Sequence, residues 1–368
     1  MSDQTVQAAP ALKEIFNPAR LQHIAEETAA VYPPFDVAAF LQRSCEGLDA
    51  LSVMQRLNRV SQCLHAGLPA DYPHALEILK QLAPRLNSGF VSMVLPEYIA
   101  LYGQEDFERS MAALTYFTGF GSSEFAIRHF LRLDFKRALK LMQKMSEDPD
   151  EHIRRLASEG SRPRLPWSFR LETLTVDPSP VLPILDNLKA DDSPYVRKSV
   201  ANHLNDITKD NPDWVLDLIE SWSLEDPRTA WIARHALRSL IKKGDRRALT
   251  IMGAGAKAQA RVEALSISPQ AVRLGDRVNL SFQLHSTGHD DQRLIIDYAI
   301  HYVKKSGGTS AKVFKLKTLA LGAGESVTVT REQQMRNFTT RVHYAGKHAL
   351  DILINGECLA STWFDLSE

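Results

Sequence analysis

Residues 193–222, SPYVRKSVANHLNDITKDNPDWVLDLIESW, hold the pattern that decides the fold of the larger part of this chain. Apolar side chains recur every three or four residues in both halves of the stretch, which is typical of amphipathic helices. Ser193-Pro194 and Asn211-Pro212 each place a capping side chain before a proline, as helix starts do. The stretch therefore predicts two consecutive helices.

The same pattern returns on both sides of this stretch. Ile153-Arg154-Arg155 lies 43 residues before Val196-Arg197-Lys198, and Ile232-Ala233-Arg234 lies 36 residues after it. Periods of this length are typical of helix-pair repeats of the HEAT or armadillo kind. Because one helix pair cannot bury its apolar side alone, we expect the pairs to stack into a solenoid with a concave surface.

The aligned repeats also share polar positions. The third aligned residue is basic in every repeat, and the residue one turn later is polar: Arg155, Lys198 and Arg234, then Glu159, Asn202 and Arg238. Since residues four apart share a helix face, the alignment predicts a polar, mostly basic stripe along successive repeats. A solvated outer face, which every solenoid helix has, explains the same pattern equally well.

Near residue 262 the periodicity changes from helical to alternating. Runs such as VNLSFQLHS and LIIDYAIHYV are separated by turn signals that include Ser306-Gly307-Gly308 and Asn355-Gly356. Six or seven short strands in the last hundred residues favour an antiparallel sandwich of the immunoglobulin type. We therefore expect a mostly α protein with a HEAT-like helical domain over residues 1–262 and a smaller all-β, Ig-like sandwich over residues 263–368. The connection GAGAKAQARVEALSISPQ (253–270) is interpreted as the end of the solenoid and a short linker.

Composition narrows the class of protein. The formal net charge is zero, but residues 110–262 hold 24 Lys+Arg against 20 Asp+Glu, which weakly favours an anionic partner. The three cysteines are far apart and suit a reducing compartment. The first residues, MSDQTVQAAPALKEIF, lack the features of a signal peptide, and no apolar run is long enough to span a bilayer. We expect a cytoplasmic protein.

Common catalytic motifs are missing. The sequence has no H-E-x-x-H, no G-x-S-x-G and no Walker loop, and Gly119-Phe-Gly121 lacks the third glycine and the preceding strand of a dinucleotide site. The histidines do not cluster at metal spacing. We expect neither metal nor cofactor, so any chemistry must come from carboxylates, arginines and aromatic side chains.

Residues 152–167, HIRRLASEGSRPRLPW, combine such side chains. A helix that carries Arg155 and Glu159 one turn apart is expected to stop at Gly160. The run from Arg162 to Pro166 then holds two prolines that fix φ, and Trp167 follows. We expect this run to extend along a phosphate backbone.

With this segment, the stretch 176–222 and the following TAWIARHALRSLIKKGD (229–245) in view, the chain resembles the HEAT-like alkylpurine DNA glycosylases, and RRLASEGSRPRLPW points to their AlkC branch. The resemblance covers about residues 20–260, and the C-terminal sandwich is similar to the Ig-like extension of some AlkC members. It implies a DNA repair enzyme that excises cationic N-alkylated bases, such as 3-methyladenine and 3-methylcytosine, from duplex DNA without base flipping.

The resemblance also suggests roles for particular residues. A base alkylated at N3 is already cationic and leaves readily, whereas the deoxyribose gains oxocarbenium character that a carboxylate and an aromatic face stabilise. Glu124, Glu159 and Trp167 are the catalytic candidates. The DNA-binding candidates are Arg155, Arg162, Arg164, Lys198, Asn202, Arg234, Arg238, Lys242 and Lys243.

Each catalytic candidate also has an ordinary structural interpretation. Glu159 is placed to pair with Arg155 across one helical turn, Glu124 to complement a helix N-terminus, and Trp167 to pack between repeats. For the whole chain, a DNA-structure-binding protein without chemistry and a protein-binding scaffold remain alternatives. We expect a monomer that binds double-stranded DNA containing alkylated bases and leaves an abasic site.

Overall fold

The computed structural model describes residues 11–338 and 342–367, and it divides them into two compact units. The first unit contains residues up to Pro212 together with Ser223–Ala236, and the second contains Asp213–Trp222 and the chain from Leu237 onward. The expected absence of a signal peptide concerns mainly residues 1–10, which lie outside the described ranges. Among the described helices, none is long and apolar enough to cross a membrane.

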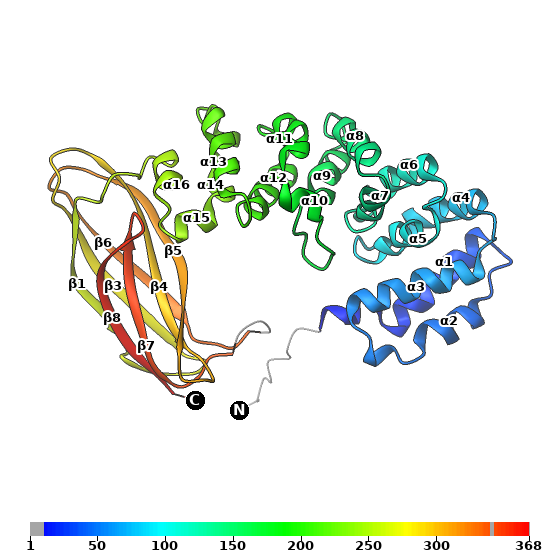
Figure 1. The fold of residues 1–368 in the computed structure, drawn as a ribbon. Coiled ribbons are helices and arrows are strands. Elements are labelled where there is room, and N and C mark those ends of the chain that lie inside the picture. The colour runs from blue at the N-terminus through cyan, green and yellow to red at the C-terminus, as the bar shows by residue number, and fades with distance from the viewer. Residues whose placement is uncertain (1–10, 339–341, 368) are drawn as a thin grey trace. The chain divides into compact units, whose positions relative to one another are not determined.

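The first unit consists of short helices that follow one another along the chain (Figure 1). Its α-helices are α1 (Pro18–Val31), α2 (Val37–Cys45), α3 (Val53–Gly67), α4 (Tyr72–Leu82), α5 (Val94–Tyr102), α6 (Phe107–Phe117), α7 (Ile127–Leu133), α8 (Phe135–Met145), α9 (Glu151–Gly160), α10 (Glu172–Val176), α11 (Leu182–Leu188), α12 (Pro194–Ile207) and α14 (Pro227–Ala236). The 3-10 turns are η1 (Leu12–Phe16), η2 (Leu48–Ala50), η3 (Ala83–Arg85), η4 (Val91–Met93) and η5 (Ser179–Val181). The second helices of successive pairs pack on each other, α3 on α5, α5 on α7, α9 on α12 and α12 on α14.

Capping side chains set the helix boundaries. The carboxylate of Asp36 accepts the amide of Ala39 at the start of α2, and Asp134 accepts the amide of Arg137 at the start of α8. Asp134 thereby divides one long helical pattern into α7 and α8, because a side chain that caps a new helix ends the preceding one. The expected N-cap at Ser193 is confirmed by its bonds from the amides of Tyr195 and Val196.

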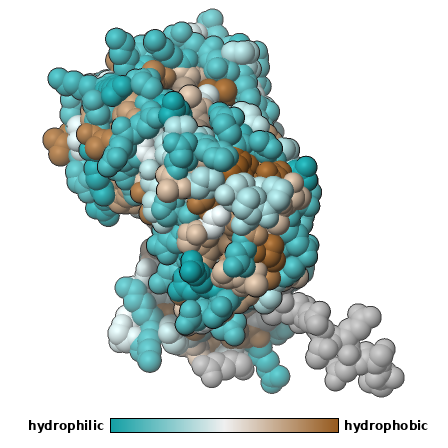
Figure 2. Space-filling model, turned by 90° about the vertical axis from the view of Figure 1, so that its right-hand side faces the viewer, coloured by the Kyte–Doolittle hydropathy of each residue, from teal (hydrophilic) through white to brown (hydrophobic). Residues whose placement is uncertain are grey.

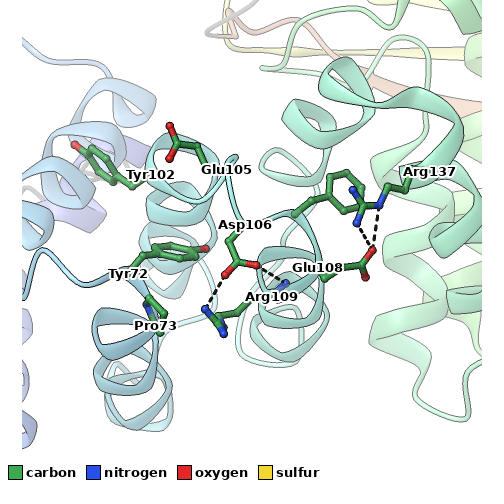
Figure 3. A pocket seen from close by; sticks show the side chains of 9 residues that line it. Tyr72, Pro73, Tyr102, Glu105, Asp106, Glu108, Arg109 and Arg137 are labelled. Carbon is green, nitrogen blue, oxygen red and sulfur yellow. Dashed lines mark hydrogen bonds and ion pairs between the residues drawn. The ribbon is translucent and has the colours of Figure 1, made fainter.

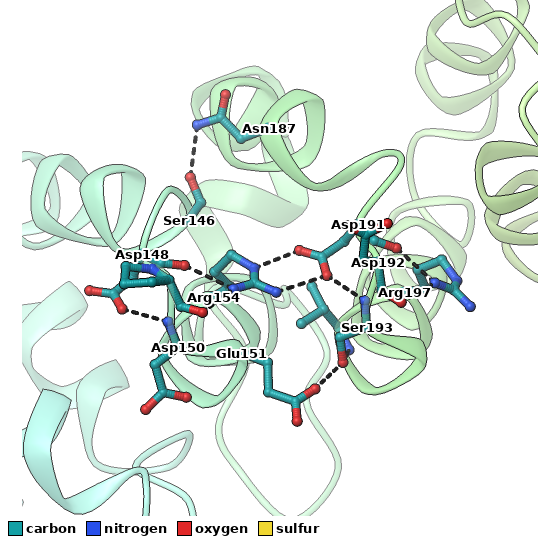
Figure 4. Close-up of polar contacts among 12 residues, drawn as sticks. Ser146, Asp148, Asp150, Glu151, Arg154, Asn187, Asp191, Asp192, Ser193 and Arg197 are labelled. Carbon is teal, nitrogen blue, oxygen red and sulfur yellow. Dashed lines mark hydrogen bonds and ion pairs between the residues drawn. The ribbon is translucent and has the colours of Figure 1, made fainter.

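The predicted repeat is visible as equivalent hydrogen bonding in α9 and α12. Nη1 of Arg154 donates to the carbonyls six and five residues before it, at 2.9 and 2.8 Å, and Nη1 of Arg197 does the same at 2.7 and 2.8 Å. Arg154 also binds Asp191, in the loop before α12, through Nε at 2.7 Å (Figure 4). Each arginine therefore ties its own helix to the loop that precedes it, and Arg154 links neighbouring repeats.

The second unit holds the remaining helices and all the described strands. They are α13 (Pro212–Ser221), α15 (Arg238–Lys242), α16 (Arg246–Ile251), β1 (Ala260–Ser268), β2 (Ala271–Arg273), β3 (Arg277–Ser286), β4 (Gln292–Val303), β5 (Thr309–Leu321), β6 (Ser326–Gln334), β7 (Gly346–Ile354) and β8 (Glu357–Ser367). One sheet has the order β1-β3-β6 and the other the order β2-β8-β7-β4-β5. Only the β2–β8 pair is parallel among these strands.

The two sheets enclose an apolar core between them. Alternate residues of β3, including Leu280 and Phe282, belong to the same buried cluster as Ile300 of β4 and Phe364 of β8. This alternation is the signal of half-buried strands, and it confirms the expected all-β sandwich. A mostly α, helical-repeat part followed by an all-β domain is therefore the architecture of this chain.

Two expectations about the junction need correction. The supposed linker forms strand β1, whose register with β3 runs from Ala260↔Ser286 to Ser268↔Asn279 with one irregularity after Glu263. The alternation of its buried and exposed side chains is interrupted once, at the irregularity after Glu263, so a search for unbroken periodicity missed it. The expected boundary between residues 262 and 263 falls inside this strand. The helix expected to carry both Arg234 and Arg238 is interrupted at Leu237, where α14 gives way to α15.

Candidate active site

Helix α9 brings Arg155 and Glu159 to one side of the first unit. Asp150 caps the helix through the amide of His152, and Ser161 follows its last residue, Gly160. A Cβ on Gly160 would lie 2.5 Å from Cγ2 of Ile127, so the glycine is needed where α9 approaches α7 closely. Arg155 reaches the segment before α7, where its Nη1 donates to the hydroxyl of Ser122 at 2.9 Å.

The loop from Ser161 to Leu171 is closed on itself and not extended as expected. The amide of Leu171 donates to the carbonyl of Pro163 at 3.1 Å, and the amide of Ser168 donates to Leu165 at 3.3 Å. Trp167 lies at the tip with φ +65° and a 61% exposed side chain. A tryptophan held in the left-handed region and left largely in solvent is unusual for a residue whose role is packing.

Arg128 of α7 binds backbone carbonyls at both ends of this loop. Its side chain is fully buried, and it donates to the carbonyls of Gly160 (3.0 Å), Arg162 (2.6 Å) and Phe169 (2.5 Å). Burial lowers the pKa of Arg128 to about 10, so the guanidinium remains charged at neutral pH. Arg132 adds a cation–π contact, with Cζ 3.6 Å from the ring centre of Phe169.

Glu159 is 6% exposed and has partners on both carboxylate oxygens. Oε1 lies 2.5 Å from Nη1 of Arg162 and 3.5 Å from Nη2 of Arg155, and Oε2 accepts the hydroxyl of Ser199 at 2.6 Å. Buried carboxylates need such partners to remain ionised. Glu159 is therefore held rigidly in an arginine-rich setting.

Glu124 lies in the turn before α7 and shares Arg155 with Glu159. Its Oε2 is 2.5 Å from Nη1 of Arg155 and accepts the hydroxyl of Ser122 at 2.9 Å. We find no hydrogen bond to Oε1 of Glu124 from any described residue. One guanidinium thus joins two carboxylates, and one of them keeps a free oxygen.

These carboxylates and Trp167 line one pocket of about 250 Å³. The side chains around it come from four separate segments: Phe90, Met93, Glu124, Phe125, Glu159, Arg162, Leu165, Pro166 and Trp167. The rings of Phe90 and Trp167 meet edge to face, with centres 6.3 Å apart. A Cβ on Gly121 would lie 2.4 Å from the carbonyl of Gly89, so this glycine permits the approach of two of the segments. The structure therefore brings the three catalytic candidates together.

Arg162 and Arg164 are placed differently from the extended arrangement expected of them. Arg162 is buried, with Nη2 2.7 Å from Asp206 on one side and Glu159 on the other. Burial lowers its pKa, but these two carboxylates outweigh that effect and raise it. Arg164 forms a two-pronged pair with Asp210, at 2.6 and 2.5 Å.

The remaining basic candidates occupy both units. In the first unit, Lys198 on α12 and Arg234 on α14 are exposed, and Asn202 on α12 is half-buried. Arg238, Lys242 and Lys243 belong to the second unit, where the two lysines are exposed. Arg234 and Arg238 were expected on one face of a single helix, but the break at Leu237 places them on α14 and α15.

Several residues of this site escaped sequence reasoning. Asp206 and Ser199 lie 44 and 40 residues after Arg162 and Glu159, which is close to one repeat period. Tyr195 lies beside Arg155, with the guanidinium carbon 5.0 Å from the ring centre. The repeat spacing itself was a signal for Asp206 and Ser199, whereas nothing in the local sequence marks Phe90 or Met93.

A second pocket, of about 500 Å³, lies between α4, α6 and α8 (Figure 3). Two ion pairs lie in it, Arg109 with Asp106 at 2.7 Å and Arg137 with Glu108 at 2.6 Å, and Glu105 also lines it. None of the site residues predicted from the sequence lines this pocket. In the described ranges no group of three or more His, Cys, Asp or Glu side chains is arranged to hold a metal ion.

The face of the molecule in Figure 2 is mostly hydrophilic, with a hydrophobic patch near its middle.

Comparisons with known proteins agree with this architecture. Residues 98–240 match the family described as DNA alkylation repair enzyme, and residues 261–368 match the C-terminal Ig-like domain of the uncharacterised protein YhaZ. YhaZ of Bacillus subtilis (strain 168) is 40% identical over 356 residues, which cover 96% of this chain and 99% of YhaZ.

A solved structure covers nearly the whole chain. The Pseudomonas fluorescens alkylpurine DNA glycosylase AlkC, bound to DNA containing an abasic site analog, is 63% identical to this chain. The match covers 98% of this chain and 100% of AlkC, with a TM-score of 0.95. This chain belongs to the AlkC family of DNA alkylation repair enzymes.

Proposed function

We propose that this protein is a monofunctional DNA glycosylase that hydrolyses the N-glycosidic bond of cationic N-alkylated bases in duplex DNA. The observation that carries the proposal is the pocket that joins Glu124, Glu159 and the exposed ring of Trp167. The similarity to a glycosylase bound to DNA with an abasic site analog supports duplex DNA as the partner and an abasic site as the product. The protein acts as a cytoplasmic monomer on its DNA.

The chemistry follows from the charge of the substrate. In 3-methyladenine or 3-methylcytosine nucleotides the base is cationic, and it takes the bonding electron pair when the bond to C1′ breaks and leaves as a neutral molecule. A general acid is therefore not required. The deoxyribose is left with oxocarbenium character, which anionic groups near C1′ stabilise.

Glu124 is the carboxylate best placed to act on the sugar. Its Oε1 has no hydrogen bond from the described protein residues, so it is available to a water molecule or to the deoxyribose ring. A water molecule held there attacks C1′ and gives its proton to the carboxylate. Glu159 adds negative charge and orients Arg155, which holds Glu124.

The ring of Trp167 lines the pocket with an apolar face. Its ring projects into solvent from a loop that Arg128 holds, and it touches Phe90 at one edge. An aromatic face against the sugar favours its cationic form and excludes water from the opposite side. We therefore assign Trp167 to contact with the damaged nucleotide.

The lining of the pocket supports a further part of the proposal. Among the described residues that line it there is no lysine amine to form a Schiff base. This supports simple hydrolysis without strand cleavage.

The test is chromatography of the bases released from methylated duplex DNA. The wild-type protein should release 3-methyladenine, 3-methylcytosine or both, while Glu159→Ala and Trp167→Ala should lose most of the activity and keep the helical circular dichroism signal. Glu108→Gln is a control that should retain full activity, because Glu108 pairs with Arg137 and neither residue lines the candidate pocket. Salt-sensitive DNA binding without any base release would instead indicate a DNA-binding protein without chemistry. Protein partners without DNA affinity would indicate a scaffold.

A further inference from the structure

A group of charged side chains lies at the base of the Trp167 loop, outside the pocket. We name it the loop-base cluster, and it consists of Arg164, Arg170, Lys209 and Asp210. Arg164 binds Asp210 with Nε–Oδ2 and Nη2–Oδ1 distances of 2.6 and 2.5 Å. The side chains of Arg170 and Lys209 are exposed, and both act electrostatically on Asp210.

The cluster is attached to the catalytic loop on one side and to α12 on the other. Arg164 and Arg170 stand before and after Trp167 in a loop that the bond from Leu171 to Pro163 closes. Asp210 follows the end of α12, where its amide donates to the carbonyl of Ile207 at 3.1 Å. A group bound by the cluster would therefore lie beside the nucleotide that Trp167 contacts.

The charges of the cluster leave a surplus for an anion. Three cations act on the carboxylate of Asp210, and of these only Arg164 is in direct contact with it. Lys209 contacts Asp206 at 2.7 Å, which is also paired with Arg162. The two-pronged geometry of Arg164 with Asp210 is the one that guanidinium groups adopt with phosphate as well as with carboxylate. Asp210 thus occupies Arg164 in the way that a phosphodiester would.

We propose that the loop-base cluster is a binding site for one backbone phosphate of DNA, and that Asp210 occupies this site until the phosphate displaces it from Arg164. The proposal rests on the proposed function only in taking DNA as the partner. It assigns Arg170 and Lys209 to phosphate binding, and it makes Asp210 a residue that weakens DNA binding. Phosphate can bind Arg164 only after the Arg164–Asp210 ion pair breaks. The protein therefore binds undamaged DNA less tightly and dissociates from it more readily.

A purely structural role for the Arg164–Asp210 pair makes the opposite prediction. If the pair only fastened the loop to the end of α12, removing the carboxylate would loosen the loop, and DNA binding would stay the same or weaken. The sign of the change in affinity therefore separates the two roles.

The experiment measures the dissociation constant of the full-length protein for an unmodified DNA duplex over a range of salt concentrations. Asp210→Asn should bind at least about threefold more tightly at low salt, and the slope of log K against log salt should steepen by up to about 0.9. Glu108→Gln makes the same change of charge in the exposed pair between Glu108 of α6 and Arg137 of α8, and it should change neither quantity appreciably.

Arg170→Gln tests the site independently of folding, because this exposed side chain makes no hydrogen bond among the described residues. It should weaken binding and make the slope shallower by about 0.9, the effect of one lost phosphate contact. Unchanged or weaker binding by Asp210→Asn, a change equal to that of Glu108→Gln, or an unaltered slope in Arg170→Gln would each overturn the proposal.

The outcome is separable from that of the proposed function. Unmodified DNA offers no base to release, so the assay reports binding alone. A wild-type protein that binds the duplex but releases no base from methylated DNA contradicts the glycosylase proposal and leaves the phosphate site standing. A wild-type protein that fails to bind the duplex at low salt overturns the phosphate site as well.

Discussion

The guanidinium of Arg155 lies 2.5 Å from the carboxylate of Glu124, so helix α9 and the turn before α7 meet through an ion pair at the edge of the pocket. The pair leaves one oxygen of Glu124 without a hydrogen bond from the described residues. It therefore holds the carboxylate in place without occupying it fully. This arrangement is the basis of the first prediction.

Glu124→Gln should lower the rate of base release by about 10²–10³-fold, the usual effect of losing one electrostatic contribution to a transition state. Gln keeps the volume and the bond to Ser122 but removes the negative charge near C1′. Single-turnover kinetics on methylated duplex DNA measure the rate, and binding to the same duplex should change little. If Glu124→Gln keeps at least a tenth of the wild-type rate, Glu124 is not a catalytic residue.

Substitutions of Trp167 should separate backbone strain from function. Trp167 has φ +65°, which costs a non-glycine residue roughly 1 kcal/mol or more. Trp167→Gly should therefore be more stable than Trp167→Ala by about 1 kcal/mol, although glycine usually destabilises a protein relative to alanine. Both variants should lose base release to a similar extent, because both lack the ring.

Urea unfolding of the two variants measures this difference. The comparison between glycine and alanine cancels the contact with Phe90, which both variants lose. The ordinary order, with alanine the more stable variant, would show that the backbone at this position carries no strain.

Arg128→Lys should destabilise the loop and slow catalysis together. The three carbonyls that Arg128 bonds diverge around one planar guanidinium, and a lysine ammonium cannot reach them all. A buried carbonyl left without a partner costs about 1–3 kcal/mol, so the loss in unfolding free energy should be of that size. Trypsin should cleave faster after Arg164 or Arg170, each of which is followed by a leucine.

Arg132→Lys is the matched control for that change. It keeps a cation above the ring of Phe169 but involves none of the three carbonyls. Wild-type protease resistance in Arg128→Lys would mean that the loop does not depend on this anchor.

The protein should be less stable in mild acid than at neutral pH, because His203 is buried in its neutral form. Burial, followed by the charges of Arg162 and Arg128, lowers its pKa to about 3, against 6.5 for an exposed histidine. As pH falls below 6.5, the unfolded chain takes up a proton that the folded protein refuses, so the stability present at neutral pH is progressively lost toward pH 3.

One refused proton corresponds to about 1.4 kcal/mol per pH unit, so the loss between pH 6.5 and pH 5 should be about 2 kcal/mol. Urea titrations at pH 7 and pH 5 measure it. His203→Gln should show a smaller loss over the same interval, because glutamine does not titrate. Equal losses in both proteins would mean that His203 is not responsible.

Local sequence signals were sufficient for the architecture. The Ser193-Pro194 cap, the repeat spacing of Arg154 and Arg197, and the alternation in β3 each depend on neighbours within a few residues or on simple repetition. Strand β1 and the break at Leu237 were missed, because a register irregularity interrupts the alternation of β1 and a helix break without glycine or proline leaves no local mark. The resemblance to AlkC glycosylases then singled out the segment around Glu159 and Trp167.

What the sequence by itself determined is therefore a helical repeat protein with a β-sandwich and a short list of carboxylates, arginines and one tryptophan. Tertiary structure alone decided how those side chains are used. Arg162 was expected on a phosphate, yet it lies buried between Glu159 and Asp206, and Arg164 meets Asp210, 46 residues away. The physical reason is that an ion pair between stacked repeats depends on how two helices pack, and no local pattern of residues specifies which of several carboxylates a given arginine will reach.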